Sequence, residues 1–311
     1  MRFISVYGVL CCITISESVN WKPNIPETAE ELKRIYSHNN NPPDPGLPYN
    51  YHDKEAIGWE NGVYSHQHHQ PYSYILTGTG KLKILLLGNS FAFRASHAIR
   101  DAFQGHFKEL RVYVHMGCRI LSDFDCPQFR QFYPIILEKM RPDVTWVIAR
   151  DYNFLNNSMT ADDVIKNSIE RLHQIKHFSK RVVVEGQNTL SGSIIKMKSG
   201  NDLNPRKEIA RRFEEGIYDL EDLHWTKKRV DEHHIRETNI LNELKKTFPD
   251  IIFDKIYDRF CVKDEDICTF YNPLNFHSYY SDQWGHLLPE GVNVLKSGYE
   301  AIAKRLIHEL E

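Results

Sequence analysis

Hydrophobic residues form short, nearly unbroken runs after residue 81, and stretches with helical spacing separate them. Such runs are typical of strands that are buried on both faces, as in parallel sheets. They predict five strands, at 83–87, 111–114, 143–149, 181–185 and 251–253. Strands that alternate with helices predict an α/β fold built on a doubly wound sheet with right-handed crossovers.

The helices are placed by their hydrophobic stripes and by capping residues. A helix-like stretch covers 91–107, and residues 205–246 are mostly helical with a charged, solvated face. Thr160 opens a helix with the stripe Ile165, Ile169, Leu172 and Ile175. The last helix begins near Pro289, because proline suits the first helical position, and its stripe is Leu295, Tyr299, Ile302 and Leu306.

The N-terminal part of the chain lacks this alternation. A short charged start, an apolar run at 3–15 and small polar residues predict a signal peptide at 1–18, and the alternative is the remnant of a transmembrane helix. Residues 19–80 are expected to be an irregular segment packed on the domain, with a short helix near 27–36. The α/β domain itself is expected at 81–311.

Composition narrows the functional classes. Hydrophobic residues make up 41% and charged residues 26%, which is ordinary for a globular protein. The net charge of −2 gives no indication of nucleic acid as a partner. The histidine-rich stretches, His66, His68 and His69 and the pair His233 and His234, lack the spacing of zinc motifs, so no metal site is predicted.

Four cysteines remain beyond the apolar run, in two local pairs. Cys118 and Cys126 form one pair, and Cys261 and Cys268 form the other. Four cysteines allow three connectivities, of which local bridging is the simplest; the alternative is free or zinc-bound thiols. Disulfides and the glycosylation sequon at Asn156 both favour a secreted, lumenal or extracellular protein, anchored to a membrane if the N-terminal run is retained.

Two stretches carry candidate chemistry. Gly88-Asn89-Ser90 stands where the first predicted strand ends and the first helix begins, so Ser90 is expected at a helix N-terminus that favours developing negative charge. Asp282 and His286 precede the last helix. A histidine there is suited to accept the serine proton, with the acid orienting it. The alternative is that Ser90 only caps its helix.

Together these stretches resemble the SGNH (GDSL-type) hydrolases, and above all the extracytoplasmic SGNH domain of membrane O-acyltransferases. Gly88-Asn89-Ser90 is similar to their Gly-Asp-Ser block, and Asp282 to His286 is similar to their late Asp-x-x-His block. The resemblance covers roughly residues 80–310. It implies a flavodoxin-like three-layer fold and an oxyanion hole formed by the N–H groups of Ser90 and of Gly117, because Gly117-Cys118 resembles the family's second block.

The sequence departs from the family pattern at three places. Asn89 replaces the aspartate, and three residues instead of two separate Asp282 from His286. The added residue either breaks the contact between the two side chains or is absorbed by Gly285 in a tight turn. The Gly-x-Asn-Asp block is not evident, and Asn153, after the third predicted strand, is the residue expected to supply an amide donor in its place. This leaves the oxyanion hole the least defined part of the site.

The resemblance implies a serine esterase or O-acyltransferase that forms an acyl-enzyme on Ser90, with no cofactor. Water or a sugar hydroxyl would then accept the acyl group, so the partners are an acylated small molecule or glycan and, for a transferase, a membrane acyltransferase. The alternative is a catalytically degenerate SGNH domain that binds a glycan, a lipid or an acyltransferase.

Overall fold

The computed structural model describes the following residues: 26, 28–40, 72–115, 117–122, 127–148, 160–187, 204–262, 265–282 and 285–311. Among them, six strands form one sheet in the order β1-β3-β2-β4-β5-β7. The strands are β1 (Tyr72–Thr77), β2 (Leu82–Gly88), β3 (Phe107–Val114), β4 (Val144–Ile148), β5 (Arg181–Gln187) and β7 (Ile252–Lys255). Every neighbouring pair is parallel except β1 with β3.

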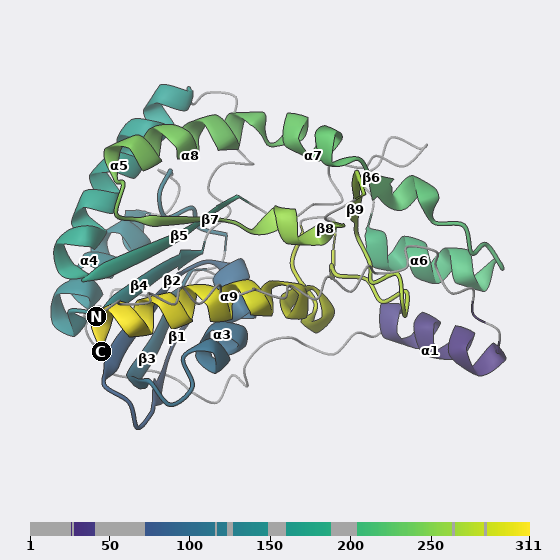
Figure 1. The fold of residues 1–311 in the computed structure, drawn as a ribbon, viewed down its shortest axis with the longest axis horizontal. Coiled ribbons are helices and arrows are strands. Elements are labelled where there is room, and N and C mark those ends of the chain that lie inside the picture. Colours follow the sequence, from purple (N-terminus) through teal and green to yellow (C-terminus); the bar gives the residue numbers. More distant parts are fainter. Residues whose placement is uncertain are drawn as a thin grey trace, which may run out of the picture.

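Helices cover both faces of this sheet (Figure 1). One face carries α3 (Ser90–Ala102) and α9 (Pro289–Leu310), and the other carries α4 (Pro127–Met140), α5 (Ala161–Phe178) and α8 (Ile235–Thr247). The central strand β2 supplies both cores: Ile84 and Leu86 face α3 and α9, whereas Leu85 and Leu87 face the other helices. All four side chains are fully buried, which explains the unbroken hydrophobic run.

The predicted doubly wound α/β fold is therefore confirmed, as a mixed sheet with mostly parallel strands. From β3 to β7 the order is that of a flavodoxin-like sheet, with its reversal at β2 and β4. Ligands of such sheets bind outside the carboxyl ends of the strands at the reversal. Gly88 of β2 and Ile148 of β4 are partners there, so Ser90 follows the strand that ends at this point.

Three sequence expectations need correction. Tyr72–Thr77 belongs to the segment that is expected to be irregular, but it pairs with β3 along its whole length. Ser73 and Tyr74 are both buried, so the segment lacks the simple alternation of a half-exposed strand. The helix expected at 91–107 ends at Ala102, and β3 begins at Phe107 instead of residue 111.

A smaller layer lies beyond the carboxyl edge of the sheet. It contains α1 (Ala29–Asn40), α6 (Pro205–Glu214), α7 (Lys227–His233) and the short 3₁₀ helices η1 (Glu221–Leu223) and η2 (Ile256–Phe260). Strands β6 (His224–Trp225), β8 (Cys261–Val262) and β9 (Ile267–Thr269) form its antiparallel sheet. Residues from α1, α6 and 271–276 share a hydrophobic core of their own, and Figure 1 shows α1 beside α6.

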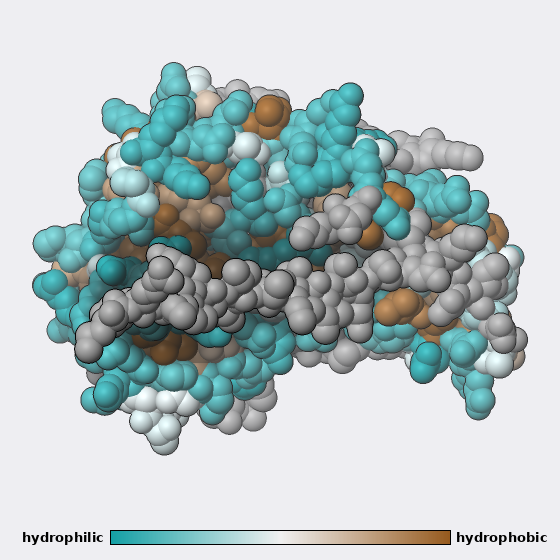
Figure 2. Space-filling view, in the orientation of Figure 1, coloured by the Kyte–Doolittle hydropathy of each residue, from teal (hydrophilic) through white to brown (hydrophobic). Residues whose placement is uncertain are grey.

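The surface in the same orientation is mostly hydrophilic, with smaller hydrophobic areas between (Figure 2). Within the described part of the chain, no helix is both long and hydrophobic enough to cross a membrane. The predicted signal peptide or transmembrane remnant at 1–18 lies outside the described residues.

Candidate active site

Ser90 is the first residue of α3, at the carboxyl end of β2. Gly88 brings the chain close to β4 and α3 at this point. A Cβ atom on Gly88 would lie 1.9 Å from the Ile148 carbonyl oxygen and 2.3 Å from the Ala92 Cβ, so no other residue fits without displacing backbone. The N–H groups of the first helical turn have no acceptor within the helix, so the Ser90 N–H makes no hydrogen bond inside α3.

Asn89 caps α3 and uses both ends of its side-chain amide. Its Oδ1 accepts a hydrogen bond from the Phe91 N–H at 3.1 Å, and its Nδ2 donates to the Cys118 carbonyl at 3.0 Å. A carboxylate in its place would keep the first contact but set a negative charge against the Cys118 carbonyl. The asparagine therefore ties the segment after β3 to the helix that carries Ser90.

The side chains of Ser90, His286 and Asp282 form a continuous chain of contacts. His286 Nε2 lies 2.6 Å from Ser90 Oγ, and His286 Nδ1 lies 2.7 Å from Asp282 Oδ2. A carboxylate only accepts hydrogen bonds, so Nδ1 carries the proton in the neutral imidazole and Nε2 is left as the acceptor. In this tautomer Ser90 donates its hydroxyl hydrogen to His286.

The added residue between Asp282 and His286 is accommodated in a turn. Gly285 has φ +85°, a conformation that other residues adopt at a cost, and its N–H donates to the Asp282 carbonyl at 3.4 Å. The Ser281 N–H donates to the His286 carbonyl at 2.8 Å, and Tyr280 pairs with Leu287. We call residues 280–282 and 285–287 the Asp–His turn. The longer spacing thus leaves the contact between the two side chains intact.

Three further side chains surround this arrangement. The ring of Phe91 stacks on the His286 imidazole with centroids 4.7 Å apart. Arg94 Nη1 donates to the Leu287 carbonyl at 3.0 Å, which ties α3 to the Asp–His turn. Burial lowers the pKa of the Arg206 guanidinium, and the charge of Asp282 opposes this shift, so the two lie within electrostatic reach.

The sequence analysis does not identify these residues as part of the site. Phe91 directly follows Ser90, so its position beside the nucleophile could have been inferred from the sequence. Arg206 stands in α6, whose position beside Asp282 depends on tertiary packing that no local pattern records.

The catalytic candidates remain accessible at the surface. The side chain of His286 is 21% exposed and that of Asp282 is 27% exposed. A nucleophile, a base and an acid in hydrogen-bond contact, open to a reactant, are the arrangement that acyl transfer to serine requires.

The other predicted site residues are only partly described. Gly117 follows β3, whose end is joined to β2 by the hydrogen bond from the His115 N–H to the Gly88 carbonyl. Gly117 is therefore near the edge that carries Ser90. Asn153, the expected third oxyanion donor, and Asn156, the expected glycosylation site, lie outside the described residues.

The predicted disulfide between Cys261 and Cys268 is present and joins facing residues of β8 and β9. Cys118 is also disulfide-bonded, and its expected partner Cys126 lies outside the described residues. The described residues contain no cluster of His, Cys, Asp or Glu that would hold a metal ion.

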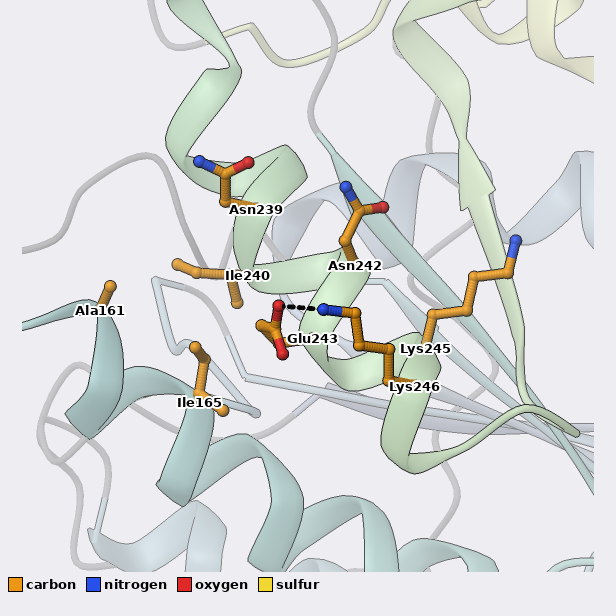
Figure 3. A pocket seen from close by; sticks show the side chains of 8 residues that line it. All are labelled: Ala161, Ile165, Asn239, Ile240, Asn242, Glu243, Lys245 and Lys246. Carbon is orange, nitrogen blue, oxygen red and sulfur yellow. Dashed lines mark hydrogen bonds and ion pairs between the residues drawn. The ribbon is translucent and has the colours of Figure 1, made fainter.

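A pocket of about 500 Å³ lies elsewhere, between α5 and α8 (Figure 3). Its lining combines Ile165 and Ile240 with polar side chains of α8. Among these, Glu243 forms an exposed ion pair with Lys246 at 2.6 Å. The pocket contains none of the residues around Ser90, and we assign it no part in the chemistry.

The solved structures that resemble the chain include a protein from Bacteroides fragilis named as an acylhydrolase, with 12% identity over 84% of this chain and 99% of the other and a TM-score of 0.43. A GDSL-like lipase from Bacteroides thetaiotaomicron shares 15% identity over 73% of this chain and 88% of the other, with a TM-score of 0.40. A catalytic mutant of an acetylxylan esterase from Geobacillus stearothermophilus shares 12% identity over 75% and 96%, with a TM-score of 0.36.

These overall similarities are low, and comparison with the curated proteins gave no match. A family model gives the assignment instead. The model of the SGNH domain that is fused to AT3 domains matches residues 59–301, which is more than half of the chain and includes Ser90, Asp282 and His286. The chain therefore belongs to this family of SGNH hydrolase domains.

Proposed function

We propose that this domain is a serine esterase that cleaves O-acyl esters through an acyl-enzyme on Ser90. The observation that carries the proposal is the pair of contacts from Ser90 Oγ to His286 Nε2 at 2.6 Å and from His286 Nδ1 to Asp282 at 2.7 Å. A serine that merely capped its helix would need neither, and Asn89 already provides the cap.

In the first step Ser90 Oγ attacks the acyl carbonyl carbon while its proton passes to His286 Nε2. Asp282 accepts the hydrogen bond from Nδ1–H, fixes the tautomer and stabilises the imidazolium. The tetrahedral intermediate then expels the alcohol, which takes the proton from His286. In the second step His286 removes a proton from water, and the hydroxide equivalent releases the carboxylic acid from Ser90.

The oxyanion of the intermediate needs hydrogen-bond donors. The Ser90 N–H is suited to this role because it stands at the N-terminus of α3, where the helix dipole also favours negative charge. Gly117 is proposed as a second donor from the resemblance to the family, and Asn153, which follows β4 in the sequence, is proposed as a third. Phe91, stacked on the imidazole, limits how far the ring of His286 rotates.

The acceptor and the compartment are further parts of the proposal. Family membership supports an acylated carbohydrate or glycoconjugate as the substrate class, and a sugar hydroxyl in place of water would make the same site an O-acyltransferase. The AT3 domains named for the family would then be the acyl source, supplied by a separate chain or by a fused one. The Cys261–Cys268 disulfide supports an extracytoplasmic location.

The test is the hydrolysis of p-nitrophenyl acetate and of O-acetylated sugars by the purified protein. We expect turnover by the wild type and loss of at least about a thousandfold in Ser90→Ala, because no other described group replaces the nucleophile. Ser297→Ala is the matched control, because it removes an exposed serine hydroxyl in the middle of α9, away from the Asp–His turn. Equal turnover by Ser90→Ala and the wild type would contradict the proposal.

A further inference from the structure

Helix α1 is bonded to the segment that leads into the Asp–His turn. Asn39, in the last turn of α1, is fully buried. Its Nδ2 donates to the carbonyls of Phe276 at 3.0 Å and Ile35 at 3.1 Å, and its Oδ1 accepts from the Ser278 N–H at 3.0 Å. One side-chain amide therefore satisfies two backbone groups of 276–278 from a helix more than two hundred residues earlier in the chain.

The hydrogen bonds continue from there to the active site. Ser278, also fully buried, donates from Oγ to the Tyr280 carbonyl at 2.9 Å and accepts from the Tyr280 N–H at 3.1 Å. The next residue, Ser281, donates its N–H to the His286 carbonyl at 2.8 Å. Asn39 is thus linked to the backbone of His286 by a path whose first members, Asn39, Ser278 and Tyr280, are buried, so leaving any of their polar groups unpaired is costly.

A second contact joins the same end of α1 to the site. Arg206 of α6, within electrostatic reach of Asp282, donates from Nη1 to the Asn40 carbonyl at 2.7 Å. The last turn of α1 therefore touches both the segment 276–278, which leads into the Asp–His turn, and the Arg206 side chain, which lies within electrostatic reach of Asp282. The match to the family model begins at residue 59, so α1 lies outside it.

We propose that Asn39 is a positioning residue for His286, which makes α1 part of the catalytic unit; this rests on the proposed function. The hydrogen bond between His286 and Ser90 requires the Asp–His turn to keep a fixed position relative to α3. This turn belongs to a loop and not to the sheet, so other contacts must hold it in place. A displacement of about 1 Å at a base reduces turnover by up to about a hundredfold. Asn39 acts through this placement and touches no reactant.

The test compares five full-length proteins: the wild type, Asn39→Ala, Ser278→Ala, the double variant of these two and the control Leu32→Ala. Leu32 packs α1 against the same small core but makes none of these side-chain hydrogen bonds, so its loss weakens α1 packing alone. Ser278→Ala leaves the Asn39 contacts in place and removes the link to Tyr280, so it carries the test if Asn39→Ala does not fold. The rate of fluorophosphonate labelling at Ser90 and the steady-state constants for p-nitrophenyl acetate are measured well below each Tm.

We expect kcat and the labelling rate to fall at least about tenfold in Asn39→Ala and Ser278→Ala, with KM within about twofold of the wild type. The double variant should lose little more than either single variant, because both interrupt one path. Leu32→Ala should lower Tm and keep the labelling rate. Wild-type labelling in a folded Asn39→Ala or Ser278→Ala would overturn the proposal, and so would an equal loss in Leu32→Ala.

Amide hydrogen exchange separates this proposal from the proposed function. In Asn39→Ala we expect faster exchange at 278–282 and 285–287 but unchanged exchange in β2 and β4. A wild type that shows neither labelling nor turnover would refute the esterase, and with it the catalytic consequence drawn for Asn39. Unchanged exchange at the turn would refute the positioning role even if Ser90 proved reactive.

Discussion

Glu185 of β5 provides a prediction about how stability depends on pH. Its register partners on the neighbouring strands are Ile148 and Asp254. The Glu185 side chain is buried, and Trp146 Nε1 donates a hydrogen bond to its Oε1 at 3.1 Å. Arg259 Nη2 donates to both oxygens of Asp254 at 2.7 Å, so the nearby cation is already paired. Glu185→Gln would remove the titration and keep a hydrogen-bonding side chain of the same shape.

The magnitude follows from the pKa of Glu185. Burial, and secondly the charge of Asp254, raise this pKa from 4.5 to about 8. Between these values the folded protein keeps a proton that the unfolded chain has lost. The contribution of Glu185 to stability is therefore fully present below about pH 4.5 and is lost as the pH rises toward 8. The slope approaches about 1.4 kcal/mol per pH unit, so the whole change is on the order of 5 kcal/mol.

The assay is urea unfolding of the wild type and Glu185→Gln at several pH values from about 5.5 to 8. Because all other groups are shared, we expect the free energy of unfolding of the variant, relative to the wild type, to rise by about 3 kcal/mol over this range. A difference that stays constant with pH, or one that changes in the opposite direction, would refute the assignment of a protonated Glu185.

Three further predictions concern the site and its supports. Asp282→Asn should lower kcat for p-nitrophenyl acetate by about 10²–10⁴-fold while leaving Tm nearly unchanged, and wild-type turnover would show that the acid is not needed. Asn89→Asp should lower the free energy of unfolding by about 1–3 kcal/mol in urea titrations, because the Cys118 carbonyl loses its donor; equal stability would contradict the role given to that contact. Replacing Cys261 and Cys268 together by serine should cost about 2–3 kcal/mol of stability, and an unchanged urea midpoint would show that the bridge adds nothing.

The parts of the fold that the sequence predicted have strong local signals. The hydrophobic run at 83–87 indicated a strand buried on both faces, and β2 is the central strand of the sheet. Ser90 and His286 were both identified as candidates because each stands at the start of a helix or just before one. Their contact is not a local property, because it depends on how the turn at Gly285 places His286 against Asp282 and on how that turn packs against α3.

The parts that were missed depend on long-range packing. Tyr72–Thr77 becomes a strand by pairing with β3, which lies more than thirty residues later. Asn39 is an ordinary polar residue near a helix end in the sequence, and only the fold places it against Ser278. Arg206 is one of many charges in a helical stretch, and its closeness to Asp282 follows from the position of α6.

Whether Ser90 is an activated nucleophile is tested most directly by labelling the purified protein with a fluorophosphonate probe and mapping the modified residue by mass spectrometry. We expect one adduct, on Ser90, that is absent in Ser90→Ala and forms at least about a hundredfold more slowly in His286→Ala, because the base no longer takes the serine proton. A folded wild type that remains unlabelled, or an adduct that persists in Ser90→Ala, would contradict the claim that Ser90 is an activated nucleophile.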